Sequence, residues 1–251
     1  QATEQLNKSI FKGALTITYL GHGGSRGWAQ ERVLNISDIY SWENFDHMPI
    51  FITATCSFTG YDDPAFVTGG EEVFLNPGGG AIALMTTVRA VYASSNIRMT
   101  ENALNYIFKR ENGQVPTVGE AFQRGKNDVS GDFNINNSRK FTLIGDPSMP
   151  VAVPQYRVAT TAIDGKPVEE AESDTLRALQ KVTIEGIITS PDGQLLTGFN
   201  GIIYPTIFDK AQIVSTLGQG ANKKYNYRIQ KNVLFKGRAS VTNGRFQFTF
   251  V

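Results

Sequence analysis

Two short apolar runs constrain this chain more than any other feature, because each one ends at a side chain that can carry chemistry. The run 14–20 leads into a glycine-rich loop that contains His22, and the run 49–55 leads directly into Cys56. Their β-branched and aromatic content and their glycine or proline flanks favour buried strands of a parallel sheet. Open α/β sheets bind ligands beyond the carboxyl ends of their strands. We therefore expect His22 and Cys56 to lie together at one edge of a sheet.

An imidazole beside a thiol would give the chain a cysteine nucleophile. A thiol with an ordinary pKa of about 8.5 is mostly protonated at neutral pH, and a neighbouring imidazole can take its proton and hold the thiolate as an ion pair. Two simpler interpretations stay open, since a free cysteine is usually a small buried hydrophobe and a histidine in a glycine-rich turn is often only a turn residue. His47 precedes the second run, so we expect it at the opposite sheet edge as a surface turn residue.

Three further residues are candidates to line a substrate pocket at the same edge. Trp28 follows the glycine-rich loop, where a substrate wall could form. A third buried strand is predicted at 79–85, and Arg89 and Tyr92 follow its end. An exposed arginine is more often only a solvated charge, so the alternative for Arg89 is a role without substrate contact.

Helix signals separate the predicted strands. Ser37 is predicted as an N-cap, and the pairs Thr68 with Glu71 and Thr117 with Glu120 have the spacing of capping boxes. Asp146 follows a fourth predicted strand and is expected to order its own turn by bonding backbone N–H groups. Helices are expected at 37–42, 68–75, 95–110 and 117–129, and the fourth strand at 140–144.

After residue 153 the pattern changes from alternating strands and helices to short strands and turns. A weak helical period at 169–179 is the exception. The phenylalanines at 246, 248 and 250 alternate with polar residues, which predicts one buried strand face. Strands are expected at 181–189, 201–208, 234–236 and in a hairpin of 238–241 with 245–251 about Asn243-Gly244. This half should be a small β-sandwich.

Composition excludes some classes of function. The balance of 24 Lys+Arg against 23 Asp+Glu, without a basic block, gives nucleic-acid binding little electrostatic support. A single cysteine excludes an internal disulfide, and no apolar run approaches the roughly 18 residues of a membrane span. Asp62 and Asp63 could ligate calcium, but two acids in a loop are more often solvated charges.

A series of motifs resembles the gingipain family of cysteine peptidases, which share a caspase-like catalytic fold. Within that family the motifs look most like those of the PorU-type sortases of the bacterial type IX secretion system. The similarity covers nearly the whole chain, and this many motifs in order are specific where single ones would be weak. They lie at 19–24, 27–32, 53–56, 76–83, 91–94 and 141–147 in the first half, and at 199–201 and 234–241 in the second.

The resemblance implies a role for particular residues and a division of the chain. It makes Cys56 the nucleophile, His22 the general base, and the backbone N–H groups of Gly23 and Cys56 the oxyanion hole. Residues 1–153 would be a gingipain-like α/β domain without its first strands, and residues 154–251 an immunoglobulin-like sandwich truncated at its end. The carboxylate that orients the histidine in this family lies upstream of the motif, so we expect a fragment, inactive in isolation, that is clipped at both ends of a longer protein.

The same resemblance implies a function at the cell surface. A PorU-type enzyme would cleave the C-terminal signal of cargo proteins at the outer membrane and pass the acyl group to an amine of an anionic lipopolysaccharide, alongside other secretion-system components. No cofactor would be required, with calcium the one candidate ion. A secreted endopeptidase that shares the site and a non-catalytic surface interaction module are the alternatives.

Overall fold

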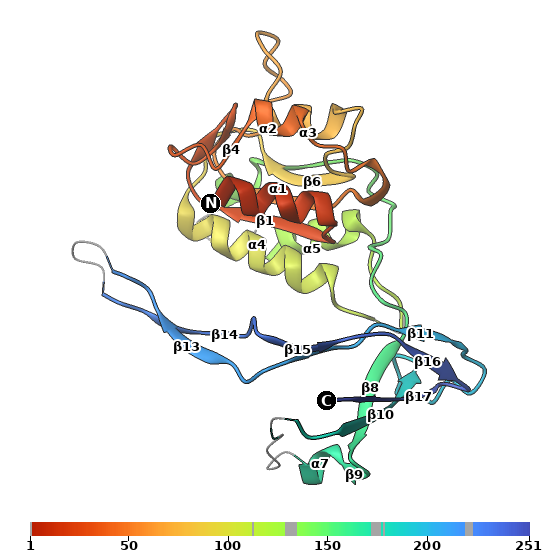
Figure 1. Cartoon of the computed structure of the whole chain (residues 1–251). Coiled ribbons are helices and arrows are strands. Elements are labelled where there is room, and N and C mark those ends of the chain that lie inside the picture. The colour runs from red at the N-terminus through yellow and green to blue at the C-terminus, as the bar shows by residue number, and fades with distance from the viewer. Residues whose placement is uncertain (1, 112, 129–134, 172–176, 178, 219–222) are drawn as a thin grey trace. The chain divides into compact units, whose positions relative to one another are not determined.

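The structure, a computed structural model, describes residues 2–111, 113–128, 135–171, 177, 179–218 and 223–251. Contacts within the chain separate two units, Gln1–Val153 and Pro154–Val251, and Figure 1 draws both. In the described residues no helix is long and apolar enough to cross a membrane.

A four-stranded sheet lies at the centre of the first unit. Its strands are β1 (Thr16–Leu20), β5 (Ile50–Ala54), β6 (Ala83–Thr87) and β7 (Phe141–Ile144), which neighbour one another in that order. β1, β5 and β6 are parallel, as expected, and every residue of β5 and β6 is buried. Buried faces on both sides explain why these strands are continuous apolar runs.

The last strand of this sheet departs from the parallel arrangement. β7 runs antiparallel to β6, and its last residue, Ile144, pairs with Leu84 near the start of β6. Asp146 therefore lies beyond the edge opposite to Cys56, and its carboxylate accepts the Ser148 N–H at 2.8 Å within its own turn, as predicted. A bond from the Ser148 hydroxyl, together with this bond from its N–H, lowers the pKa of Asp146.

Helices cover both faces of the sheet (Figure 1). On one face, α4 (Ala93–Ile107) and α5 (Val118–Asp128) pack against β5 and β6 through a cluster that includes Ile52, Met85, Met99 and Phe122. The other face packs against residues of α1 (Ala2–Lys12), α2 (Ile36–Tyr40) and α3 (Gly69–Leu75). The result is a three-layer α/β arrangement.

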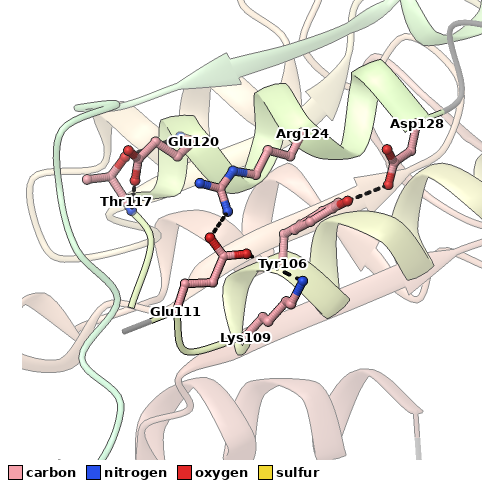
Figure 2. Close-up of polar contacts among 7 residues, drawn as sticks. All are labelled: Tyr106, Lys109, Glu111, Thr117, Glu120, Arg124 and Asp128. Carbon is pink, nitrogen blue, oxygen red and sulfur yellow. Dashed lines mark hydrogen bonds and ion pairs between the residues drawn. The ribbon is translucent and has the colours of Figure 1, made fainter. Parts of the chain in front are cut away.

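Polar contacts at the surface connect α4 to α5, as Figure 2 shows. Tyr106 donates to Asp128 at 2.6 Å, a bond that raises the pKa of the phenol, and Arg124 donates to Glu111 at 2.9 Å. Lys109 lies 3.4 Å from the same Glu111 carboxylate, whose pKa the two cations lower. Exposed pairs of this kind contribute little to stability.

Two predicted capping boxes are present. The Glu71 carboxylate accepts the Thr68 N–H at 2.9 Å at the start of α3. At α5, Glu120 accepts the Thr117 N–H at 2.9 Å and returns its own N–H to the Thr117 hydroxyl at 3.2 Å, as Figure 2 shows. Each box satisfies two donors that a helix start would otherwise leave unpaired.

The N-cap of α2 is Asn35, and the prediction of Ser37 was wrong. The Asn35 side chain accepts the N–H groups of Ser37 at 3.0 Å and Asp38 at 3.4 Å, and Asp38 accepts the Asn35 N–H at 3.0 Å. The short strand β4 (Leu34–Asn35) ends at this residue, which leaves its backbone extended and suited to the cap.

We expect Asn35→Ala to lower the free energy of unfolding by about 1 kcal/mol, because two donors at the start of α2 lose their acceptor. Urea unfolding followed by circular dichroism measures the change. Ser37→Ala is the matched control in the same turn, because it removes only the hydroxyl that donates to the Asn35 side chain and keeps the capping acceptor; it should cost less than half as much. Equal losses in the two variants would contradict the assignment of the cap.

Two helices of the first unit were not anticipated. α1 directs Leu6 and Ile10, one helical turn apart, at the core, and the residues around them are mostly polar. The short helix α6 (Ile135–Ser138) lies between the helix expected at 117–129 and the strand expected at 140–144.

The second unit is built on a six-stranded antiparallel sheet. Its strands, in spatial order, are β11 (Gly201–Ile203), β16 (Ala239–Thr242), β17 (Arg245–Phe250), β10 (Val182–Thr189), β8 (Arg157–Ile163) and β9 (Lys166–Pro167). The hairpin of β16 and β17 turns at Asn243 and Gly244, both with positive φ, as a two-residue turn requires. The phenylalanine alternation is confirmed, with Phe246 and Phe250 less than a tenth exposed.

A two-stranded ribbon forms the second layer of this unit. β12 (Thr206–Phe208) pairs with β15 (Val233–Lys236), and Phe235 stacks on Phe248 and Phe250 with ring centroids 5.7 and 5.1 Å apart. The ribbon continues into the pair β13 (Gln212–Ser215) and β14 (Asn226–Ile229). Because this second layer is a two-stranded ribbon rather than a second sheet of several strands, the immunoglobulin-like sandwich is not confirmed in the described residues. Of the weak helix expected at 169–179, α7 (Val168–Ala171) is present, and 172–176 and 178 lie outside the described residues.

Candidate active site

The register of β1 and β5 determines where His22 and Cys56 lie. The last paired residues of the two parallel strands are Leu20 and Ala54, so each candidate residue follows its strand by two positions. Both residues line one cavity of about 200 Å³ at the carboxyl edge of the sheet. The structure therefore places at one cavity two residues that the sequence has on separate segments.

The Cys56 thiol is held against the segment that follows β6. It is half-buried, and its Sγ donates to the Val91 carbonyl at 3.7 Å. Ser57, the next residue, has a φ of +52°, and its N–H donates to the Arg89 carbonyl at 3.2 Å. A non-glycine residue in the left-handed region is held there by its surroundings, and such residues are concentrated at functional sites.

The backbone of His22 is fixed while its side chain is exposed. The His22 carbonyl accepts the Ala29 N–H at 2.7 Å and the Tyr19 hydroxyl at 2.6 Å. Burial raises the pKa of Tyr19 above its ordinary value. In the free protein the Sγ of Cys56 donates to the Val91 carbonyl. Hydrogen bonds between catalytic groups often tighten only when substrate is bound.

The loop after His22 folds into a small sheet that carries Trp28 inward. β2 (Gly23–Gly24) pairs with β3 (Gly27–Trp28), which pairs with β4. Trp28 is 2% exposed, stacks on Tyr19 at 4.5 Å, and contacts Phe51 and Phe58 at 5.7 Å. It is a core residue that supports the loop, and the expectation that it lines a substrate pocket is corrected.

Gly23 lies where a side chain would not fit. A Cβ on this residue would be 2.5 Å from the Thr55 hydroxyl and 2.8 Å from the Gly27 carbonyl. The bond from Ala29 to the His22 carbonyl makes Gly23 and Trp28 a non-hydrogen-bonded pair, so the Gly23 N–H points away from β3. This arrangement leaves the N–H available to an oxyanion.

Arg89 and Tyr92, the other pocket candidates, have different partners. Arg89 forms two contacts with Asp62, at 2.5 and 2.9 Å, which lower the pKa of that carboxyl. Tyr92 is 71% exposed, with the Lys140 ammonium 5.4 Å from its ring centroid, and the cavity wall is instead formed by its neighbours Val91 and Ala93.

The calcium site receives no support from the carboxylates after Cys56. Asp62 is engaged by Arg89, and Asp63 accepts the Ala65 N–H at 2.9 Å. Among the described residues, no group of three or more His, Cys, Asp or Glu side chains could hold a metal ion.

A buried pair of asparagines supports the site and was not anticipated. Asn96 of α4 is 6% exposed and donates to the Ala54 carbonyl at 3.2 Å, two residues before Cys56. Asn137 of α6 donates to the Asn96 side chain at 3.2 Å and accepts the Tyr92 N–H at 2.9 Å. These bonds join the end of β5 to the start of α4. A polar residue within the apolar face of a helix is the signal that could have revealed Asn96.

We expect Asn96→Ala to destabilise the protein by about 2 kcal/mol, because the Ala54 carbonyl and the Asn137 amide would be buried without partners. Chemical denaturation of the full-length protein measures the loss. Asn105→Ala, on the exposed face of the same helix, is the control and should change stability by less than about 0.5 kcal/mol. A loss as small as that for Asn96 would show that water replaces the amide.

Known proteins resemble this chain in sequence and in fold. The family model described as Peptidase family C25 matches residues 1–152. Among curated proteins, none matches the chain significantly.

Solved structures also resemble the chain. The Arg-specific cysteine proteinase gingipain R (RgpB) is 14% identical, with a TM-score of 0.54 over 98% of this chain and 48% of its own. A complex of the Porphyromonas gingivalis RgpB pro- and mature domains has 15% identity and the same TM-score, covering 98% of this chain and 49% of that one. Dimeric latent PorU from Porphyromonas gingivalis is 25% identical, with a TM-score of 0.37, covering 98% and 22%.

The chain spans about half the length of the two gingipain structures and shares their fold. The family match extends over more than half of the chain and includes both His22 and Cys56. The chain belongs to peptidase family C25, the gingipain-like cysteine peptidases.

Proposed function

We propose that the full-length protein is a cysteine peptidase that transfers the acyl part of its substrate through a thioester on Cys56. The observation that supports this proposal is the pairing of Leu20 with Ala54, after which His22 and Cys56 line the same cavity. A scaffold without chemistry has no need of these two groups at adjacent strand ends.

The reaction uses each group at a stated atom. His22 takes the proton from Sγ, and the thiolate attacks the scissile carbonyl carbon. The backbone N–H groups of Gly23 and Cys56 donate to the oxygen that becomes negatively charged. His22 then gives its proton to the leaving amine, which breaks the peptide bond and leaves a thioester. Water or an amine, deprotonated by His22, resolves the thioester.

The acceptor distinguishes a peptidase from a transpeptidase. We favour an amine acceptor on an anionic lipopolysaccharide, with cargo proteins cleaved at a C-terminal signal, at the cell surface or outer membrane. Support for this branch is the set of PorU-type motifs in the sequence, such as 76–83 and 234–241. Water as the acceptor would make the protein an endopeptidase with the same site.

The test traps the thioester in the full-length protein. A peptide substrate is mixed with the enzyme, the reaction is quenched with acid, and the intact mass is measured. We expect an adduct on Cys56 with the mass of the acyl part, and none in Cys56→Ala. Addition of a glycine amide should then convert the product from an acid to an amide if the enzyme is a transpeptidase. The absence of any adduct and any product would overturn the proposal.

A further inference from the structure

A second and larger cavity, of about 840 Å³, adjoins His22. Its walls come from the segment between His22 and Ser37, which forms β2, β3 and β4. His22 lines both this cavity and the smaller one, whereas Cys56 is among the lining residues of the smaller cavity alone. The imidazole therefore stands at the boundary between the two.

Two arginines give this cavity a positive charge. Arg26 and Arg32 line it, and none of the described residues that line it is acidic. Arg89 and Arg124 each pair with a carboxylate, but in the part of the chain that the structure describes neither Arg26 nor Arg32 has an ion pair. Arg26 acts on Tyr40, whose hydroxyl donates to Glu72 at 2.6 Å, and the Asp38 carboxylate accepts the Asn35 N–H in the α2 cap. The two guanidinium groups are thus available to an anion from outside.

The backbone around Arg32 is held in a tight turn. Ala29 and Arg32 have φ values of +60° and +56°, in the left-handed region that non-glycine residues rarely adopt. Arg32 donates its N–H to the Ala29 carbonyl at 3.2 Å, and Val33 donates to the carbonyl of the buried Trp28 at 3.0 Å. A turn anchored in the core presents its side chain with less loss of conformational freedom on binding.

The chemistry of acyl transfer decides which part of a substrate enters this cavity. The acyl part stays on Cys56, while the leaving amine receives its proton from His22. The segment on the C-terminal side of the scissile bond must therefore pass the imidazole, on the side that Cys56 does not line. We propose that this cavity is a subsite in which Arg26 and Arg32 bind an acidic side chain of that segment. The proposal rests on the proposed function.

Guanidinium groups suit this role because they bind carboxylates through paired N–H donors and remain charged at all physiological pH values. We expect about a tenfold preference in kcat/KM for a substrate with Glu over one with Gln on the leaving side, as a charge-assisted hydrogen bond would give. The preference should fall as salt is raised, because the cavity is open to solvent.

The experiment uses the full-length protein and two peptides with the same acyl part. They differ by Glu or Gln at the second and third residues after the scissile bond. In the R26Q/R32Q double variant the tenfold preference should drop below twofold, because the Glu peptide loses its charged partners. R124Q, which removes an arginine paired with Glu111 at α5, should retain the preference.

Each outcome has one meaning. Cleavage of both peptides at the same rate by the unmodified protein would overturn the subsite and leave the peptidase assignment intact. Cleavage of neither peptide would overturn the proposed function. In that case the binding of fluorescent Glu and Gln leaving segments to Cys56→Ala, followed by anisotropy, still tests the arginines. A Glu preference that R26Q/R32Q removes supports the anion site, and equal binding overturns it.

Discussion

Replacement of His22 by alanine should lower the rate constant for acylation of Cys56 by about 100- to 10,000-fold, the usual contribution of a general base. His22 and Cys56 share one cavity, and a protonated thiol is a poor nucleophile. The rate of thioester formation with a peptide substrate, measured by quenched-flow mass spectrometry on the full-length protein, tests this expectation.

The chain offers a matched control, because it has a second histidine at the other end of β5. His47 lies in the short 3-10 helix η1 (Phe45–His47), and its Nε2 is 2.9 Å from the Phe11 carbonyl at the end of α1. His47→Ala should keep acylation within about twofold of the unmodified protein, since the residue is distant from the reacting groups. An undiminished acylation rate in His22→Ala would exclude the imidazole as the base.

Replacement of Gly23 by alanine should have the second large effect, on both activity and stability. The new Cβ would meet the Thr55 hydroxyl at 2.5 Å and the Gly27 carbonyl at 2.8 Å, and the carbonyl belongs to the backbone of β3. β2 would have to move away from Thr55, the residue before Cys56. The Gly23 N–H would then leave the position suited to an oxyanion. We expect acylation to fall by about 100-fold and stability by about 1–3 kcal/mol.

Gly24 provides the control for this substitution. It is the next residue of the same short strand, and a Cβ built on it meets nothing within 4 Å. Gly24→Ala should therefore leave acylation and the urea midpoint close to those of the unmodified protein. Equal losses at the two positions would mean that the general flexibility of the glycine loop matters, rather than the contact between Gly23 and Thr55.

The local signals in the sequence were sufficient for much of the fold. The apolar runs that became β1 and β5 are long enough to be recognised, and their order in the chain already implied a shared edge for His22 and Cys56. The capping box of Thr68 with Glu71 depends on residues three positions apart, and the hairpin at Asn243 depends on two adjacent residues. Interactions this short can be predicted from the sequence alone.

The sequence by itself therefore determined the strands β1, β5 and β6, the helices α3, α4 and α5, and the sheet edge at which His22 and Cys56 lie, whereas α1 and α6 were missed. The direction of a side chain depends on which strands and helices surround it, and only the tertiary structure decided this for several residues. Trp28 turned inward because β2, β3 and β4 pair with one another. Arg89 donates to Asp62, 27 residues away in the chain, and Asn96 donates to the Ala54 carbonyl, 42 residues away. Contacts between residues so far apart form only when the sheet and its helices are assembled. A local pattern can mark a residue such as Asn96 as unusual, but it does not identify the partner.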